Sequence, residues 1–299
     1  MPKVDAPYII GVIREKEKGL LGTDEYTRII GAPTAQEAVR ALADTPYGIH
    51  LEQAATPFAA LEAHLYEELT WLQEVVSDER VLQFISARHD GLRIASAFMH
   101  YMAGKSKDGL ERSLSSIPVN ALTSVIWEDA GYEELPHIWR DFIREEKERA
   151  QQEGWSKKDM LLRVKEKTIA VMQELAFTPL MREVAQVTRE RLDFEAGMRS
   201  TTADSAPAAA NAPLWASEAA IEAVEQGVGA TAYEYAFDAT LIDGIRTQRA
   251  TPTGYDPIIA YWMAKEIEAR TLRLILSAKL GGLPQQTLHS LVRPLYLAA

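Results

Sequence analysis

The sequence contains no cysteine, which excludes disulfide bonds, thiolate metal sites and cysteine nucleophiles. Long apolar runs are missing as well. The run at residues 8–13 leads directly into the charged segment 14–18, so it is too short for a secretory signal. Elsewhere no stretch approaches the ~20 uninterrupted apolar residues that a membrane-spanning helix needs. These absences fit a reducing compartment, and we expect a cytoplasmic protein.

Positive charge is in deficit, because 32 Lys and Arg residues face 43 Asp and Glu residues, a formal net charge of -11. A body of this sign repels polyanions, so nucleic acid is not an expected partner. It also disfavours direct binding to anionic lipid headgroups. We therefore expect any membrane association to run through another protein, without lipid insertion.

Signals for β-strands are scarce, since the β-branched residues mostly fall within helical periodicity. Apolar residues instead recur at steps of three and four, which predicts helices over most of the chain. One apolar stripe runs from Phe58 to Val76 and the next from Val81 to Met102, with Ser77 as the N-cap between them. We interpret these two segments as an antiparallel pair of long helices.

Two later helices begin with a cap residue followed by proline. A threonine-proline pair at 178–179 follows a candidate helix over about 156–177 and opens a second one that runs to about residue 200. An aspartate-proline pair at 256–257 opens a helix that the glycines and proline at 281–284 end. The helix that follows the Ser77 cap is the third long helix with a capping residue at its start. The sequence therefore predicts an all-α fold in which three long helices start alike.

Each of these three helices carries an acidic residue three to four turns after its start. Carboxylates within long helices usually pair with bases one turn away, and we expect the same here. The three acids are Asp90, Asp193 and Glu268, and the bases that would pair with them are Arg93, Arg189 and Lys265. In this interpretation the acids orient each helix within its own unit and share no active site.

The similar helix starts predict three related helical subdomains, over residues 1–104, 105–203 and 204–299. A turn-rich break at 104–109 marks the first boundary. A stretch rich in Ser, Thr, Ala and Pro at about 200–213 marks the second, and we expect a flexible linker there.

Motifs that bind nucleotides or metals are incomplete in this sequence. Gly104-Lys105-Ser106 resembles the end of a Walker A loop, but Met99 stands where that loop needs a glycine. Only one Glu-x-x-His motif occurs, from Glu134 to His137, whereas a di-iron bundle requires two.

Other catalytic patterns are missing too. His89 and His100 lie three turns apart on a helix and are too distant to share an ion. Neither an Asp-Asp-x-x-Asp magnesium cluster nor a Gly-x-Ser-x-Gly elbow is present. The sequence therefore predicts no catalytic residue, no cofactor and no metal site.

The three long helices each carry an acid-led motif, at 88–90, at 191–193 and, in divergent form, around 268–273. Further distinctive segments are residues 8–21, 25–30, 45–48, 264–276, 279–284 and 293–296. Together these segments resemble the C/d subunits of V-type and archaeal-type rotary ATPases. The asparagine that commonly stands three residues after each motif acid in that family is replaced by Arg93, Ala196 and Thr271.

This resemblance implies a three-lobed, funnel-shaped helical body with pseudo-threefold symmetry. It also implies a non-catalytic central-stalk subunit, peripheral to the cytoplasmic face of a membrane, that couples central shaft subunits of D and F type to the membrane rotor ring during proton or sodium transport. The alternative is an all-helical enzyme with an unrecognised active site between lobes. Binding to shaft and ring favours the first function, and a deep pocket with convergent, perturbed carboxylates favours the second.

Overall fold

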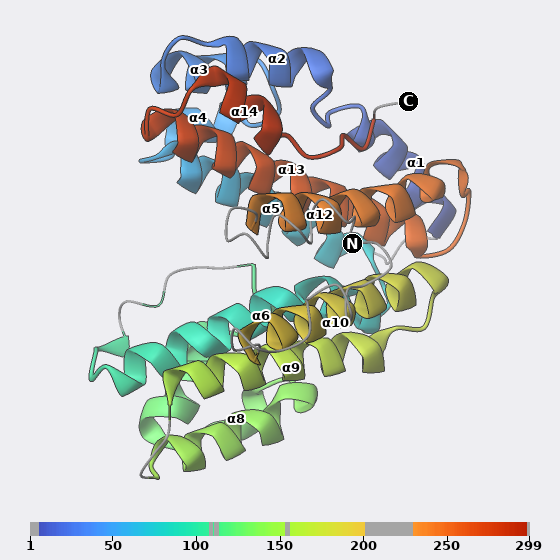
Figure 1. The fold of residues 1–299 in the computed structure, drawn as a ribbon. Coiled ribbons are helices and arrows are strands. Elements are labelled where there is room, and N and C mark those ends of the chain that lie inside the picture. Colours follow the sequence, from blue (N-terminus) through green and yellow to red (C-terminus); the bar gives the residue numbers. More distant parts are fainter. Residues whose placement is uncertain (1–5, 108–109, 111–113, 153–155, 201–229, 298–299) are drawn as a thin grey trace. The chain divides into compact units, whose positions relative to one another are not determined.

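The computed structural model describes residues 6–107, 110, 114–152, 156–200 and 230–297. Within these ranges the regular elements are all helical, and no strand is present, which confirms the predicted all-α fold (Figure 1). None of the helices in the described ranges combines the length and the apolar character needed to cross a membrane.

The chain divides into two compact units. Unit 1 combines Met1–Ser77 with Thr178–Ala299, and unit 2 is the continuous segment Asp78–Phe177. The predicted division into subdomains 1–104, 105–203 and 204–299 is a different partition and stays a prediction, as does pseudo-threefold symmetry. Most of the predicted linker at 200–213 lies outside the described residues.

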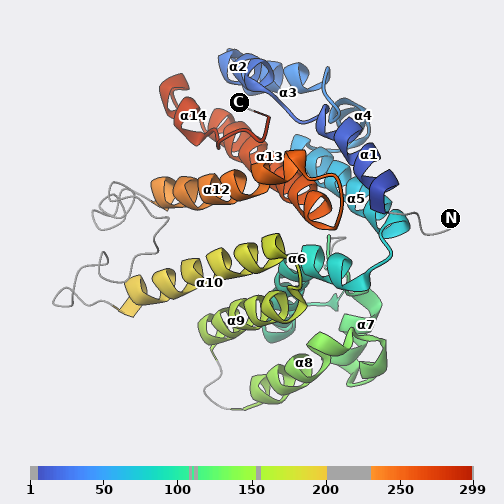
Figure 2. The same cartoon turned by 90° about the vertical axis from the view of Figure 1, so that its right-hand side faces the viewer.

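Unit 1 is built around one long helix, α13 (Asp256–Leu280), most of whose 25 residues are buried. A helix that is buried on nearly all sides must be surrounded by other elements, and α13 packs against α1, α3, α5, α10, α12 and α14. Figure 2 shows α5 and α12 beside it. The bounds are α1 (Ala6–Glu17), α2 (Thr23–Gly31), α3 (Ala35–Leu42), α4 (Gly48–Gln53), α5 (Pro57–Val75), α10 (Pro179–Ser200), α12 (Ala230–Arg246) and α14 (Gln285–Leu291).

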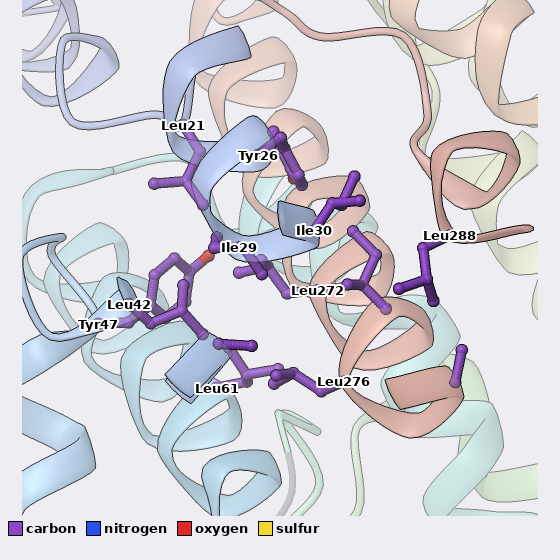
Figure 3. Close-up of a cluster of buried hydrophobic side chains, with 13 residues drawn as sticks. Leu21, Tyr26, Ile29, Ile30, Leu42, Tyr47, Leu61, Leu272, Leu276 and Leu288 are labelled. Carbon is purple, nitrogen blue, oxygen red and sulfur yellow. The ribbon is translucent and has the colours of Figure 1, made fainter. Parts of the chain in front are cut away.

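Apolar side chains from both ends of the chain form a core of unit 1 (Figure 3). Ile29 on α2, Leu61 on α5 and Leu272 on α13 are almost completely buried in this cluster. Burying such side chains contributes about 1.5–3 kcal/mol each. The core therefore fixes the first helices of the chain onto its last long helix.

Unit 2 is organised by the pair α6 (Glu79–Met102) and α9 (Lys157–Leu175). The two helices approach closely at Gly91, where an added Cβ would lie 2.2 Å from the Thr168 Oγ1 atom. α8 (His137–Ala150) packs on both helices, and α7 (Val119–Thr123) continues into a π-helical turn over Ser124–Glu128 that covers α6.

The long helices over 58–76 and 81–102, predicted as a pair, each have a different main partner within their own unit. Those segments are α5 and α6, but α5 packs on α13 in unit 1 and α6 packs on α9 in unit 2. Both partners are distant in sequence. Periodicity identified the apolar face of each helix, and the tertiary structure selected which helix covers that face.

The predicted caps are partly confirmed. Thr178 accepts a hydrogen bond of 3.2 Å from the amide three residues later and caps α10. The cap of α6 is Asp78 and not Ser77, because the Asp78 carboxylate accepts from both the amide (3.0 Å) and the guanidinium (2.9 Å) of Arg80. Asp256 is the first residue of α13, and its side chain does not cap the helix.

Candidate functional site

The most distinctive chemical feature of the structure is a set of buried carboxylates, each hydrogen-bonded to donors from distant segments. Buried charges are stable only when they are paired and hydrogen-bonded. In unit 1 they are Glu17, Glu68, Asp238 and Glu268, and in unit 2 they are Asp90 and Glu146.

Glu268 on α13 lies at the centre of one such network. Its carboxylate accepts hydrogen bonds from the Leu21 amide (2.5 Å), the Tyr47 hydroxyl (2.8 Å) and the Lys265 ammonium (3.1 Å). Burial, and then the Glu268 charge, raise the pKa of Tyr47 well above its usual value, so its hydroxyl stays protonated as a donor. This network ties the segments before α2 and α4 to α13.

Glu68 on α5 forms a second network with α1 and α13. The Lys16 ammonium lies 3.0 Å from both carboxylate oxygens, and the Tyr261 hydroxyl donates to the carboxylate at 2.9 Å. Burial and the neighbouring Glu68 charge raise the pKa of Tyr261. Three helices that are far apart in the sequence thus meet at a single carboxylate.

Two further networks anchor the C-terminal segment of unit 1. Glu17 accepts from Arg14 and from the Tyr296 hydroxyl, both at 2.7 Å. Asp238 on α12 is fully buried between Arg270 (2.7 Å) and Arg293 (2.8 Å). The residues after α14 are therefore held by charge pairs as well as by apolar packing.

Asp90 is the corresponding buried carboxylate of unit 2. It accepts from the Ser115 hydroxyl (2.8 Å), from the amide (2.6 Å) and hydroxyl (2.8 Å) of Ser116, and from the Trp139 indole (3.3 Å). These partners replace the predicted Arg93, whose guanidinium donates to the Ile117 carbonyl oxygen at 2.8 Å. Burial raises the pKa of Asp90 above its ordinary value, although the hydrogen bonds oppose that rise.

The three acids that the sequence places at similar positions have different environments. Glu268 pairs with Lys265 as predicted, and both side chains are buried. Asp193 pairs with Arg189 as predicted, at 3.8 Å, but its side chain is 65% exposed. Asp90 belongs to the other unit. Two of the three positions are therefore buried, hydrogen-bonded carboxylates, and the third is a surface ion pair.

Two further sequence candidates occupy surface positions. Gly104 lies with φ +64 in the turn that ends α6, and Lys105 and Ser106 directly after it are exposed. His137 is the exposed first residue of α8, directly after the N-cap Pro136.

Each of the two units contains a small hollow. A cavity of about 20 Å³ beside Glu268, Tyr26 and Arg293 has room for about one water molecule. A groove of about 220 Å³ in unit 2 is lined by polar and charged side chains, three of which are hydrogen-bonded to one another. In that groove Asp129 accepts from Lys147 at 2.8 Å and from the Tyr132 hydroxyl at 2.9 Å.

The same groove shows one large pKa shift. Burial, and then the Asp129 hydrogen bond, raise the pKa of Tyr132 to about 12. A tyrosine with a raised pKa stays protonated at neutral pH. In this groove Tyr132 is therefore a hydrogen-bond donor to Asp129 at neutral pH.

Sequence reasoning missed Glu68, although a signal was present. Glu68 lies three residues after Leu65 and four before Leu72, within the apolar stripe of α5. His64 falls on the same stripe and is also buried. A polar residue at a core-facing position must have a buried partner, so the break in the stripe could have identified both.

Comparison with known proteins gives one family match that covers nearly the whole chain. The model of the ATP synthase (C/AC39) subunit family matches residues 9–153 and 159–291. A search of curated proteins gives no significant match. The family match includes the three acid-led motifs and both units of the fold. The chain therefore belongs to the ATP synthase (C/AC39) subunit family, the C/d subunits of V/A-type ATP synthases.

Proposed function

We propose that this protein is a non-catalytic central-stalk subunit of a rotary V/A-type ATPase or ATP synthase, which couples the rotor shaft to the membrane ring during proton or sodium transport. Membership of the C/AC39 family supports this function. The observation that carries it is that the buried charges of unit 1 cross-link helices that are distant in the sequence.

A part that transmits torque must resist deformation between its contact surfaces. In unit 1, buried polar contacts join residues 193 positions apart at Glu68, 247 apart at Glu268 and 279 apart at Glu17. Breaking a buried ion pair by removing one partner costs about 3–5 kcal/mol. Such contacts make local opening of the helices unfavourable, which suits mechanical coupling.

The partners in this proposal are the D- and F-type shaft subunits and the membrane rotor ring. The net charge of -11 favours a peripheral position at the cytoplasmic face that depends on contacts with protein and not with lipid. The three-lobed arrangement, with boundaries at 104 and 203, is part of the same proposal.

A bridging assay tests the coupling role. Immobilised shaft complex is incubated at low salt with detergent-solubilised ring, with and without the full chain, and ring capture is measured. We expect capture of the ring only when the chain is present, and binding of the chain to each partner alone. An unrelated acidic protein of similar net charge is the control. Failure to bind either partner, or binding to the shaft without capture of the ring, would refute the proposed role.

The non-catalytic part of the proposal is tested separately. The purified chain is incubated with ATP and magnesium, and phosphate release is measured beside a buffer control. We expect release at the background rate. Sustained turnover that copurifies with the chain through a second column would contradict the proposal and favour a helical enzyme.

A further inference from the structure

Three potential metal ligands meet between α4 and α5, apart from the carboxylate networks. His50 lies on α4, and His64 and Glu67 lie one turn apart on α5, which packs against α4. Residues three apart on a helix point to the same side. One ligand atom from each of the three side chains lies within 4.8 Å of the other two.

His64 is the unusual member of this group. The residue is 95% buried, since only 5% of its surface is exposed, and neither ring nitrogen has a hydrogen-bond partner. The centroid of its ring lies 4.5 Å from the centroid of the Tyr47 ring and 5.4 Å from that of the His50 ring. A buried polar group without a partner carries a penalty of about 1–3 kcal/mol. An imidazole with two unsatisfied nitrogens therefore calls for a ligand.

His50 is unsatisfied in a similar way. Its Nε2 atom lies 2.9 Å from a Glu67 carboxylate oxygen, but the two are not aligned for a hydrogen bond. The Glu67 side chain is 68% exposed and can turn about its own bonds, whereas the His50 side chain is only 13% exposed. The group thus has two positioned imidazoles and one adjustable carboxylate at its solvent side.

The charge around the group suits a cation only because the nearby lysines are already paired. A neutral imidazole is the form that binds metals. Lys265 is paired with Glu268 and Lys16 with Glu68, and Glu67 adds a negative charge.

We propose that His50, His64 and Glu67 form a binding site for a divalent transition-metal ion of the Zn²⁺ type. Two imidazoles and a carboxylate are a ligand set that zinc accepts, with water in the fourth position. Zinc-nitrogen bonds of about 2.0–2.1 Å require ligand atoms roughly 3.4 Å apart, closer than the present 4.8 Å limit, so binding an ion would draw the two imidazole rings together as well as turn the exposed Glu67 side chain.

The role of such an ion would be structural. It would join the six-residue helix α4 to α5 next to the Tyr47 ring. It would also give a partner to the unsatisfied ring nitrogens of His50 and His64 that bind it. An ion that binds only the folded chain stabilises it in proportion to the logarithm of its concentration over its Kd. Bound zinc should therefore raise the unfolding temperature of the full chain.

Zinc titration of the full, chelator-stripped chain tests the site. Binding is measured by calorimetry with Zn²⁺ alone, Co²⁺ absorption reports the coordination geometry, and thermal unfolding gives a second readout. We expect one equivalent of zinc, a tetrahedral Co²⁺ spectrum and a zinc-dependent rise in the unfolding temperature. Glu67→Gln should weaken binding on the order of 10- to 100-fold or more, and His64→Gln should abolish it.

The matched controls lie on the same chain. Glu74→Gln removes an exposed carboxylate two turns further along α5, and His289→Asn removes an exposed histidine of α14. Both should bind zinc like the unchanged chain. Because Glu67 is exposed, Glu67→Gln should fold normally even if His64→Gln does not. The proposal is overturned if the stripped chain binds no zinc, as expected for a site filled by water. It is also overturned if Glu67→Gln binds as tightly as Glu74→Gln.

Discussion

Replacing Glu268 by glutamine tests whether the buried networks stabilise unit 1. The carboxylate accepts from Leu21, Tyr47 and Lys265, and a glutamine of nearly the same size offers only one acceptor oxygen. The Lys265 side chain is 2% exposed and would keep its charge without a buried counter-ion. The substitution therefore removes a charge without creating a cavity.

The expected loss of stability is large. Removing one partner of a buried ion pair costs about 3–5 kcal/mol. For a unit of this size, 1 kcal/mol shifts the unfolding midpoint by about 2–4 °C, so the midpoint should fall by roughly 6–20 °C. Urea unfolding followed by far-UV circular dichroism measures the loss. Hydrogen exchange of the Leu21 amide should accelerate in the variant, because that amide donates to Glu268.

A second substitution should restore part of the loss. In the chain with both Glu268→Gln and Lys265→Met, no buried ammonium remains. The glutamine oxygen can accept from the Leu21 amide, and its NH₂ group can donate to the Tyr47 oxygen. The double variant should therefore be more stable than Glu268→Gln alone, which is the signature of direct coupling.

The matched control is Asp193→Asn on α10, because the sequence places Asp193 at a similar distance from its helix start. Its side chain is 65% exposed and 3.8 Å from Arg189. Exposed pairs one helical turn apart contribute about 0.3–0.5 kcal/mol. If Glu268→Gln cost no more than Asp193→Asn, or if adding Lys265→Met gave no recovery, the assignment of Glu268 as a buried structural anchor would be wrong.

Three further predictions concern single positions. Asp90→Asn leaves the Trp139 indole N–H facing an amide donor and should cost about 1–3 kcal/mol. Because burial raises the folded-state pKa of Asp90, the folded chain binds that proton more tightly than the unfolded chain. The free energy of unfolding of the unchanged protein should therefore rise relative to that of Asp90→Asn as the pH falls. The rise should occur between the raised folded-state pKa of Asp90 and its unfolded-state pKa of about 3.9. Gly91→Ala places a Cβ 2.2 Å from Thr168 Oγ1 and should destabilise the α6–α9 pair by about 1–3 kcal/mol, and by less when Thr168 is also alanine. Gly11→Ala meets no atom within 4 Å inside α1 and should stabilise the chain by about 0.5–1 kcal/mol.

Urea unfolding at several pH values checks all three. A stability difference between the unchanged chain and Asp90→Asn that is constant across the acid range would contradict the raised pKa. If Gly91→Ala lowered the free energy of unfolding equally in the unchanged chain and in a Thr168→Ala chain, the clash would not involve Thr168. A destabilising Gly11→Ala would mean that α1 has a close neighbour at that position.

The sequence alone determined the secondary structure closely, because helices depend on interactions within about one turn. A threonine followed by proline predicts the start of α10 at Pro179, and the structure begins that helix there. The apolar stripe from Phe58 to Val76 predicts α5, which spans Pro57–Val75. Two cap assignments failed. The cap of α6 is Asp78, one residue after the predicted Ser77, because neighbouring polar residues compete for the same amides. Asp256 begins α13, but its side chain does not cap that helix. The family was also accessible from sequence, because motifs near both ends of the chain carry it.

The tertiary structure decided which polar residues are buried and with which partners. Asp90, Asp193 and Glu268 lie at similar distances from the predicted starts of their helices, yet two are buried and one is exposed. Glu268 is satisfied by a backbone amide 247 residues away, a partner that no local pattern specifies. The meeting of His50, His64 and Glu67 likewise depends on the packing of α4 on α5. Local sequence fixes helices because their hydrogen bonds are local. The surroundings of a charge depend on whichever distant segment the fold places against it.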